Sequence, residues 1–265
     1  MTGFWFALSL TFLSGVATIL GGLLATHKIM LRRGVMAVAL GFSAGAMLYV
    51  SFTDILGKSL NAFSELYDKM PAYALMSAAF FTGILVLVFL NRLIPDDINI
   101  NEQEGVQPKK NLFKKRLMRS GILIGVSLCI HNFPEGFLVF INAFENPGTG
   151  FAVAIALAIH NIPEGIAVGA PLYAATKNRF KTVGLTALTG LAEPVGAIIG
   201  YLLLRDVLSG ATLGWVFGLV AGMMVYICVD ELLPAAKRYE TNQRQTTYGF
   251  IAGMAVLAGS ITLLQ

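Results

Sequence analysis

Apolar runs of about twenty residues recur along this chain of 265 residues and constrain its fold more than any other feature. Eight can be counted, at about 4–25, 34–57, 71–94, 118–141, 149–173, 180–205, 211–234 and 247–264. A helix of about twenty residues is long enough to cross a hydrocarbon core of roughly 30 Å. Hydrophobic residues make up 56% of the chain and charged residues 13%, unlike a typical water-soluble domain. The sequence therefore predicts an all-α integral membrane protein with eight transmembrane helices.

The first run could be mistaken for a secretory signal. It lacks a basic leading region and a convincing cleavage site, so we expect it to be a membrane span. Cys129 and Cys228 both lie within apolar runs, which suggests neither a disulfide framework nor a cysteine-type zinc site. The one sequence that ends like a phosphate-binding loop lacks its first glycine, and we expect no ATP binding.

Basic residues are divided unevenly between the two predicted sides of the membrane. Of the 19 Lys and Arg residues, 16 lie in or beside the connections that follow the first, third, fifth and seventh spans. Lys58, Lys69 and Arg205 lie on the other side. Because basic residues accumulate in cytoplasmic loops, we expect both termini to face outward. The net charge of +4 then reflects membrane topology and does not indicate a nucleic-acid partner.

The connection 95–117 is longer and more polar than the others, and its end is basic. We expect a solvated cytoplasmic linker that lies near anionic lipid headgroups. A regulatory role is an alternative, but no residue in the segment specifies one.

Two segments of the chain are similar to each other. GFSAGAMLYVSFTDIL at 41–56 aligns without gaps with GLVAGMMVYICVDELL at 218–233, and the alignment pairs Asp54 with Glu231. The two segments belong to spans that run in opposite directions. They therefore predict an inverted repeat, a plan common among secondary transporters, with the binding site near the middle of the membrane.

The neighbouring spans extend this similarity more faintly, with SGVAT at 14–18 against TGLAE at 189–193. Gly83 is likewise matched by Gly253. Spans one to three, about 4–94, thus resemble spans six to eight, about 180–264, with spans four and five between them. We expect one domain in a 3+2+3 arrangement.

The two central spans contain nearly identical hexapeptides, HNFPEG at 131–136 and HNIPEG at 160–165. His131 lies 12 residues from Arg119 at the inner edge of its span, a rise of roughly 18 Å. His160 lies some 11 residues, or roughly 16 Å, from the outer start of its own span. The two motifs can therefore face each other near the middle of the membrane.

The spacing within each motif suits metal binding. A His at i and a Glu at i+4 project from the same helix face, so each motif can present one imidazole and one carboxylate to a tetrahedral ion. The predicted ligands of this principal ion are His131, Glu135, His160 and Glu164. A neighbouring second ion, bridged by the two glutamates, would take Asn132, Asn161 and Glu193, the last from span six.

The prolines and glycines of the motifs fit the same interpretation. Pro134 and Pro163 remove the amide groups that would bond the carbonyls of the residues four positions earlier, and an ion or its water could use those oxygens. Gly136 and Gly165 permit close helix packing.

Structural roles are the alternative for such residues. A single intramembrane His or Asn often joins two helices by a hydrogen bond, and a single Pro often only kinks a helix. In a passive helix bundle, the negative charges of three midplane glutamates would have no positive partner, because the sequence places no Lys or Arg at their depth. Such charges cost several kcal/mol, so a divalent cation or protons are expected there.

Paired HNxPEG motifs in spans four and five, eight spans and outward termini resemble the ZIP (Zrt-, Irt-like) family of metal transporters, over essentially the whole chain. The resemblance implies uptake of zinc and other divalent metals into the cytoplasm through a binuclear site at the positions named above. It implies a multi-pass protein of the bacterial plasma (inner) membrane. Many members carry a histidine-rich loop between spans three and four, which 95–117 lacks.

Imidazole and carboxylate ligands without thiolate suit Zn²⁺, and also Fe²⁺, Mn²⁺, Co²⁺ and Cd²⁺. The metal is then the transported substrate and not a cofactor. An intramembrane metal-dependent hydrolase is the alternative, since such sites can activate water. Against it, HxxxE differs from the HExxH zincin pattern, and we expect no enzyme activity. The assembly state is open, with a homodimer among the options.

Three acidic residues near the ends of the repeated spans complete the candidate site. Asp54 lies near the outer end of span two, without the nearby proline of similar family members, and its counterpart Glu231 lies beside Asp230 near the inner end of span seven. Acidic groups at opposite mouths of one pathway would concentrate divalent cations there. The alternative is that each carboxylate only caps or solvates a helix end.

Overall fold

The structure, a computed structural model, describes residues 2–93, 109–204 and 210–264. Every regular element in these residues is helical. The elements, in chain order, are α1 (Thr2–Ala25), the 3-10 helix η1 (Lys28–Leu31), α2 (Arg33–Val50), the π-helix η2 (Ser51–Ile55), α3 (Leu56–Ser64), α4 (Lys69–Leu93), α5 (Lys109–Glu145), α6 (Pro147–Thr176), α7 (Arg179–Leu204), α8 (Gly210–Tyr226), the π-helix η4 (Ile227–Leu232), α9 (Leu233–Tyr239) and α10 (Gln245–Leu264).

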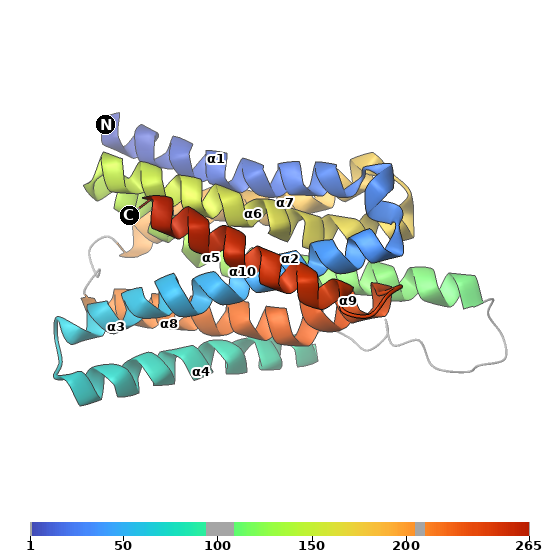
Figure 1. Ribbon diagram of the computed structural model, residues 1–265. Helices are drawn as coiled ribbons and strands as arrows, with labels where there is room; N and C mark the ends of the chain where they lie inside the picture. Colours follow the sequence, from blue (N-terminus) through green and yellow to red (C-terminus); the bar gives the residue numbers. More distant parts are fainter. Residues whose placement is uncertain (1, 94–108, 205–209, 265) are drawn as a thin grey trace.

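The predicted all-α membrane fold is confirmed. In the described ranges, seven continuous helical segments are long and apolar enough to cross a membrane. They coincide with the first seven expected spans, and α10 covers the eighth, 247–264. The segments alternate in direction, so that both termini lie at the same end of the bundle (Figure 1).

The boundaries of several spans differ from those expected. The second and seventh segments, Arg33–Ser64 and Gly210–Tyr239, are longer than their apolar runs. In α3 the extra turns are held by packing on α8, where Ser59 Oγ donates a hydrogen bond of 2.7 Å to the Gly214 carbonyl. α5 begins at Lys109, so the last part of the expected linker 95–117 is helical; the rest, 95–108, lies outside the described residues.

The helices form two neighbouring groups. α1, α5, α6 and α7 pack against one another and form the first bundle. The second bundle contains α2, α3, α4, α8, α9 and α10, with α2 packed on α10 and α4 on α8 (Figure 1). α2 contacts α6, and α8 contacts α5, so the two central spans lie where the bundles meet.

Both members of the sequence repeat contain a π-helical segment at corresponding positions. η2 occupies Ser51–Ile55, and η4 occupies Ile227–Leu232, which the alignment of 41–56 with 218–233 places opposite each other. A π-helical turn inserts one residue into the helix and is frequently found at functional sites. The two segments carry the acidic residues expected at the pathway mouths.

Close helix contacts repeat in the same way. A Cβ at Gly45 of α2 would overlap the carbonyl oxygen of Phe250 in α10, so only glycine fits there. A Cβ at the aligned Gly222 of α8 would overlap the carbonyl oxygen of Phe80 in α4. The α2–α10 contact therefore has the same construction as the α8–α4 contact. A pseudo-two-fold axis that relates an inverted repeat requires this equivalence.

Candidate metal centre

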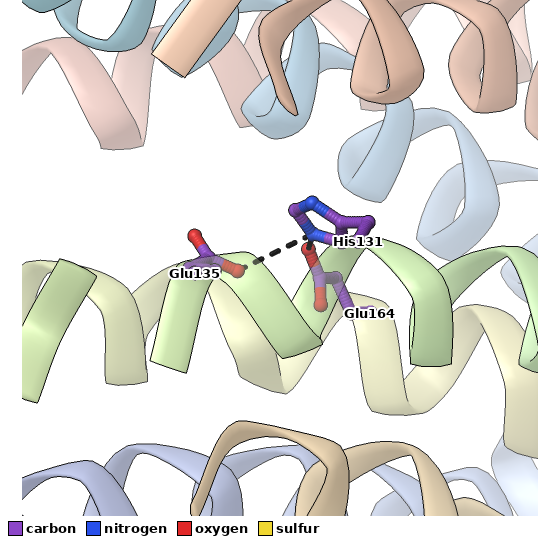
Figure 2. Close-up of side chains that lie close together, drawn as sticks. All are labelled: His131, Glu135 and Glu164. Atoms are coloured by element: carbon purple, nitrogen blue, oxygen red, sulfur yellow. Dashed lines mark hydrogen bonds and ion pairs between the residues drawn. The ribbon is translucent and has the colours of Figure 1, made fainter. Parts of the chain in front are cut away.

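His131, Glu135 and Glu164 form a buried cluster between α5 and α6. His131 and Glu135 lie one turn apart on α5, and Glu164 extends toward them from α6 (Figure 2). The Nε2 atom of His131 lies 3.3 Å from Oε2 of Glu135 and 3.1 Å from Oε1 of Glu164. All three residues are at most 3% exposed. One ligand atom from each lies within 4.8 Å of the others, which is close enough for one ion to bind all three.

The fourth residue expected in this group is His160. Its backbone belongs to α6, one turn before Glu164, but its side chain lies outside the described residues. Its assignment as a ligand therefore stays a prediction.

The helices continue through the prolines of both motifs, since Pro134 lies inside α5 and Pro163 inside α6. The carbonyl of Pro163 accepts a buried hydrogen bond of 2.6 Å from Ser43 Oγ in α2. This bond joins the two bundles near the level of the cluster. Sequence reasoning missed Ser43, because no local pattern shows which helix packs against the motif.

Asn132, Asn161 and Glu193 form a second buried group, on the side of α5 and α6 that faces α1 and α7. Asn161 Nδ2 donates to Oε1 of Glu193 at 2.6 Å, and to both the carbonyl and the hydroxyl of Ser14 at 3.0 Å. Asn132 Nδ2 donates to the carbonyl of Thr189 at 3.1 Å. All of these donors and acceptors join α5 or α6 to α1 or α7.

These anchored side chains leave oxygen atoms available inside the protein. Asn132, Asn161 and Glu193 are all 0% exposed. Within the described residues, the Oδ1 atoms of both asparagines and Oε2 of Glu193 have no hydrogen-bond partner. Buried oxygens without partners are uncommon in proteins and point to a missing ligand or water.

The two groups are near neighbours but not one cluster. Glu193 is absent from the set of ligand atoms within 4.8 Å. Its carboxyl group nevertheless interacts electrostatically with those of Glu135 and Glu164. Three carboxyl groups thus share one buried region, as expected from the sequence.

Lys58 is a basic residue next to one of the expected pathway residues, Asp54. It belongs to α3, and its charge interacts with that of Glu135. Its Nζ atom forms an ion pair of 2.8 Å with Oδ2 of Asp54, and both side chains are about one-third exposed. The spacing of four residues between Asp54 and Lys58 could have indicated this pair in the sequence.

The expected pathway residues lie apart from the central cluster. Asp54 is in η2, and Asp230 and Glu231 are in η4. Asp230 is exposed and Glu231 half-buried. Asn91 of α4 donates hydrogen bonds to the Tyr226 hydroxyl at 2.8 Å and to Oδ2 of Asp230 at 3.5 Å.

Comparison with known proteins adds an independent finding. A family model described as ZIP Zinc transporter matches residues 99–263. Several similar proteins carry the name Zinc transporter ZupT. One from Stenotrophomonas maltophilia is 43% identical over 98% of this chain and 96% of its own length. One from Corynebacterium aurimucosum is 46% identical over 97% of each chain, and one from Chlorobium limicola 45% identical over the whole of both. The chain therefore belongs to the ZIP family of zinc transporters.

Proposed function

We propose that this protein takes up zinc and other divalent metals into the cytoplasm through a binuclear His/Glu/Asn centre near the middle of the bacterial inner membrane. It is a multi-pass membrane transporter and not an enzyme, so zinc is its cargo and not a resident cofactor. The intramembrane hydrolase considered from the sequence is thereby set aside.

The observation that carries the proposal is the buried cluster of His131, Glu135 and Glu164. Placing a carboxylate at the bilayer centre costs about 3 kcal/mol or more. Two carboxylates that converge on one imidazole nitrogen at 3.1 and 3.3 Å form the donor set of a divalent cation. A bound cation would offset the cost of burying them.

A second position is supported by the unpartnered oxygens on the other side of the same helices. The Oδ1 atoms of Asn132 and Asn161 and Oε2 of Glu193 are acceptors only, as a cation requires. We assign Glu135 and Glu164 to bridge the two ions, because both carboxyl groups interact electrostatically with that of Glu193.

The ligand types limit the cargo. The described cluster contains no thiol, and the Cys228 thiol donates to the Ala44 carbonyl at 3.4 Å. Imidazole and carboxylate donors favour Zn²⁺, Fe²⁺, Mn²⁺, Co²⁺ and Cd²⁺ over Cu(I), which prefers sulfur.

The orientation follows from the basic residues. We assign the end of the bundle that carries η1 and the α6–α7 connection to the cytoplasm, because Lys28, Arg32, Lys177 and Arg179 lie there. Both chain ends then face outward.

Uptake by purified protein in proteoliposomes tests the proposal. Labelled Zn²⁺ should accumulate saturably without ATP and respond to imposed metal, pH or voltage gradients. Competition by Fe²⁺, Mn²⁺, Co²⁺ and Cd²⁺ would define the cargo. A well-folded sample that moved no metal, or that hydrolysed peptide or lipid instead, would contradict the proposal.

A further inference from the structure

The pseudo-two-fold relation extends into the first bundle. SGVAT at 14–18 lies in α1 and TGLAE at 189–193 in α7, and the two segments cross at their glycines. A Cβ at Gly15 would overlap the carbonyl oxygen of Gly190, and a Cβ at Gly190 would overlap that of Gly15. This reciprocal contact lies where such an axis would pass between α1 and α7.

The same relation connects α5 with α6. A Cβ at Gly136 would overlap the carbonyl oxygen of Glu193, and a Cβ at Gly165 would overlap that of Thr18. These two glycines end the two hexapeptides and are equivalent. Thr18 on α1 is therefore the structural counterpart of Glu193 on α7, as the alignment of SGVAT with TGLAE also indicates.

The asparagines agree with this assignment. Asn161 donates to the Ser14 carbonyl, and Asn132 to the Thr189 carbonyl, and Ser14 and Thr189 are aligned. Asn161 also donates to Glu193 at 2.6 Å. The pseudo-two-fold relation therefore predicts that Asn132 lies beside Thr18, as Asn161 lies beside Glu193. The second metal position thus has a carboxylate on one side and a threonine on the other.

The Thr18 hydroxyl is buried and has no hydrogen-bond partner in its own helix, α1. Thr18 is 0% exposed, and its Oγ1 has no hydrogen-bond partner within the described part of the chain. Two other buried threonines bond the carbonyl four residues earlier, Thr11 to Ala7 at 3.0 Å and Thr186 to Thr182 at 2.9 Å. For Thr18 that carbonyl belongs to Ser14, which accepts from Asn161 instead. The hydroxyl is left for another partner.

We propose that Thr18 is a positioning residue of the second metal position, where its hydroxyl holds a water ligand of the ion on the Asn132 side. The inference rests on the binuclear centre proposed above. A threonine side chain is shorter than that of glutamate, so a water molecule fills the distance that the Glu193 carboxylate spans on the other side. Such a water needs polar partners, and the unpartnered Oδ1 of Asn132 supplies another.

The test uses substitutions that separate the hydroxyl from the packing. Thr18→Val has nearly the same shape without the hydroxyl, and Thr18→Ser keeps the hydroxyl. Thr11→Val is the matched control, because Thr11 is also 0% exposed on α1 but its hydroxyl is bonded to Ala7. Thr18→Ala removes the same hydroxyl if valine is not tolerated. The number of bound Zn²⁺ ions and their affinities are measured by calorimetry and elemental analysis of purified protein.

Wild-type protein should bind two ions. Thr18→Val should weaken the second by about 10- to 100-fold, the usual effect of losing a group that holds a metal ligand. The first ion should be unaffected, Thr18→Ser should restore the second, and Thr11→Val should match wild type. Unchanged second-ion affinity in Thr18→Val and Thr18→Ala, or an equal loss in Thr11→Val, would overturn the role of Thr18 alone. A single ion in wild type would overturn the binuclear centre and this inference with it.

Discussion

His131 and Glu164 lie 33 residues apart in the chain, yet Nε2 of one is 3.1 Å from Oε1 of the other, in the interior between α5 and α6. Two helices contribute to one cluster because the hexapeptides occur at matched depth in antiparallel spans.

Substitution of the principal ligands should abolish transport. We expect Glu164→Ala and His160→Ala to lower Zn²⁺ uptake more than about 100-fold, since groups that merely support a ligand are worth 10- to 100-fold. Uptake is measured in proteoliposomes, with folding and membrane insertion checked separately. Glu65→Gln, an exposed carboxylate at the end of α3, is the control and should transport normally. Normal uptake by a well-folded Glu164→Ala would refute the assignment.

Replacing Asn132 and Asn161 should change the transport rate or the metal preference and should not abolish transport. Replacing Asn132 and Asn161 together with alanine removes two amide oxygens from the second position, and we expect about a 5- to 10-fold change in rate or in Zn²⁺/Cd²⁺ preference. Asn142→Ala, whose amide donates only to the Leu138 carbonyl among described partners, is the control on α5. Anomalous scattering from metal-soaked crystals that showed one ion, with both asparagines uncoordinated, would contradict the second position.

Asp54 and Lys58 should act in opposite directions on capture of external metal. Asp54→Asn removes a charge that attracts cations, so the apparent KM should rise roughly 3- to 10-fold with a smaller change in maximal rate. Lys58→Gln releases Asp54 from its ion pair of 2.8 Å and should lower KM about 2- to 5-fold. Both effects should be largest at low ionic strength, where screening is weakest. Wild-type kinetics for both variants at low salt would leave Asp54 with only a structural role.

Asp230 and Glu231 should affect release to the cytoplasm. Neutralising both as Asp230→Asn with Glu231→Gln removes transient ligands at the inner mouth, and the maximal rate should fall roughly 3- to 10-fold with metal still bound at the centre. Single-turnover release from metal-loaded protein would show the step directly. If release is as fast as in wild type, the η4 carboxylates have no part in the pathway.

Glu240, between α9 and α10, gives a pH-dependent prediction. Its carboxylate accepts the backbone N–H of Thr246 at 2.9 Å and pairs with Lys237 at 3.1 Å, and the pKa of Glu240 is lowered from its ordinary value of 4.5, first through the hydrogen bond to Thr246. A lowered folded-state pKa stabilises the fold above pH 4.5, and this contribution is lost as pH falls through the folded pKa. Thermal melts of wild type and Glu240→Gln should therefore differ near neutral pH and converge in acid. A pH-independent difference would exclude this cause.

Much of the architecture could be predicted from the sequence, because the bilayer permits few solutions. Apolar runs of span length must be helical, and a spacing of four residues puts His131 and Glu135 on one helix face whatever surrounds them. The proximity of Glu164 to His131 could be predicted only because the two hexapeptides lie at similar depth in antiparallel spans.

The details that could not be predicted are those that depend on neighbouring helices. The π-helical turns at η2 and η4 change the register of α2 and α8 without a signal in the hydrophobic pattern. The anchoring of Asn161 by Ser14 depends on how α1 crosses α6. The hydrogen bond from Ser43 to the Pro163 carbonyl likewise depends on how α2 packs against α6, and it joins residues 120 positions apart in the chain.

The described ligands proposed for the principal ion are His131, Glu135 and Glu164. All three project from α5 and α6, two helices of the first bundle. The second bundle therefore contributes none of these three side chains. The Ser43–Pro163 hydrogen bond between the bundles is worth about 1 kcal/mol, and one hydrophobic core with buried residues from α2, α5, α6 and α8 also joins them. Because these three side chains come from α5 and α6 alone, a change in the packing of the second bundle would not by itself separate them from one another.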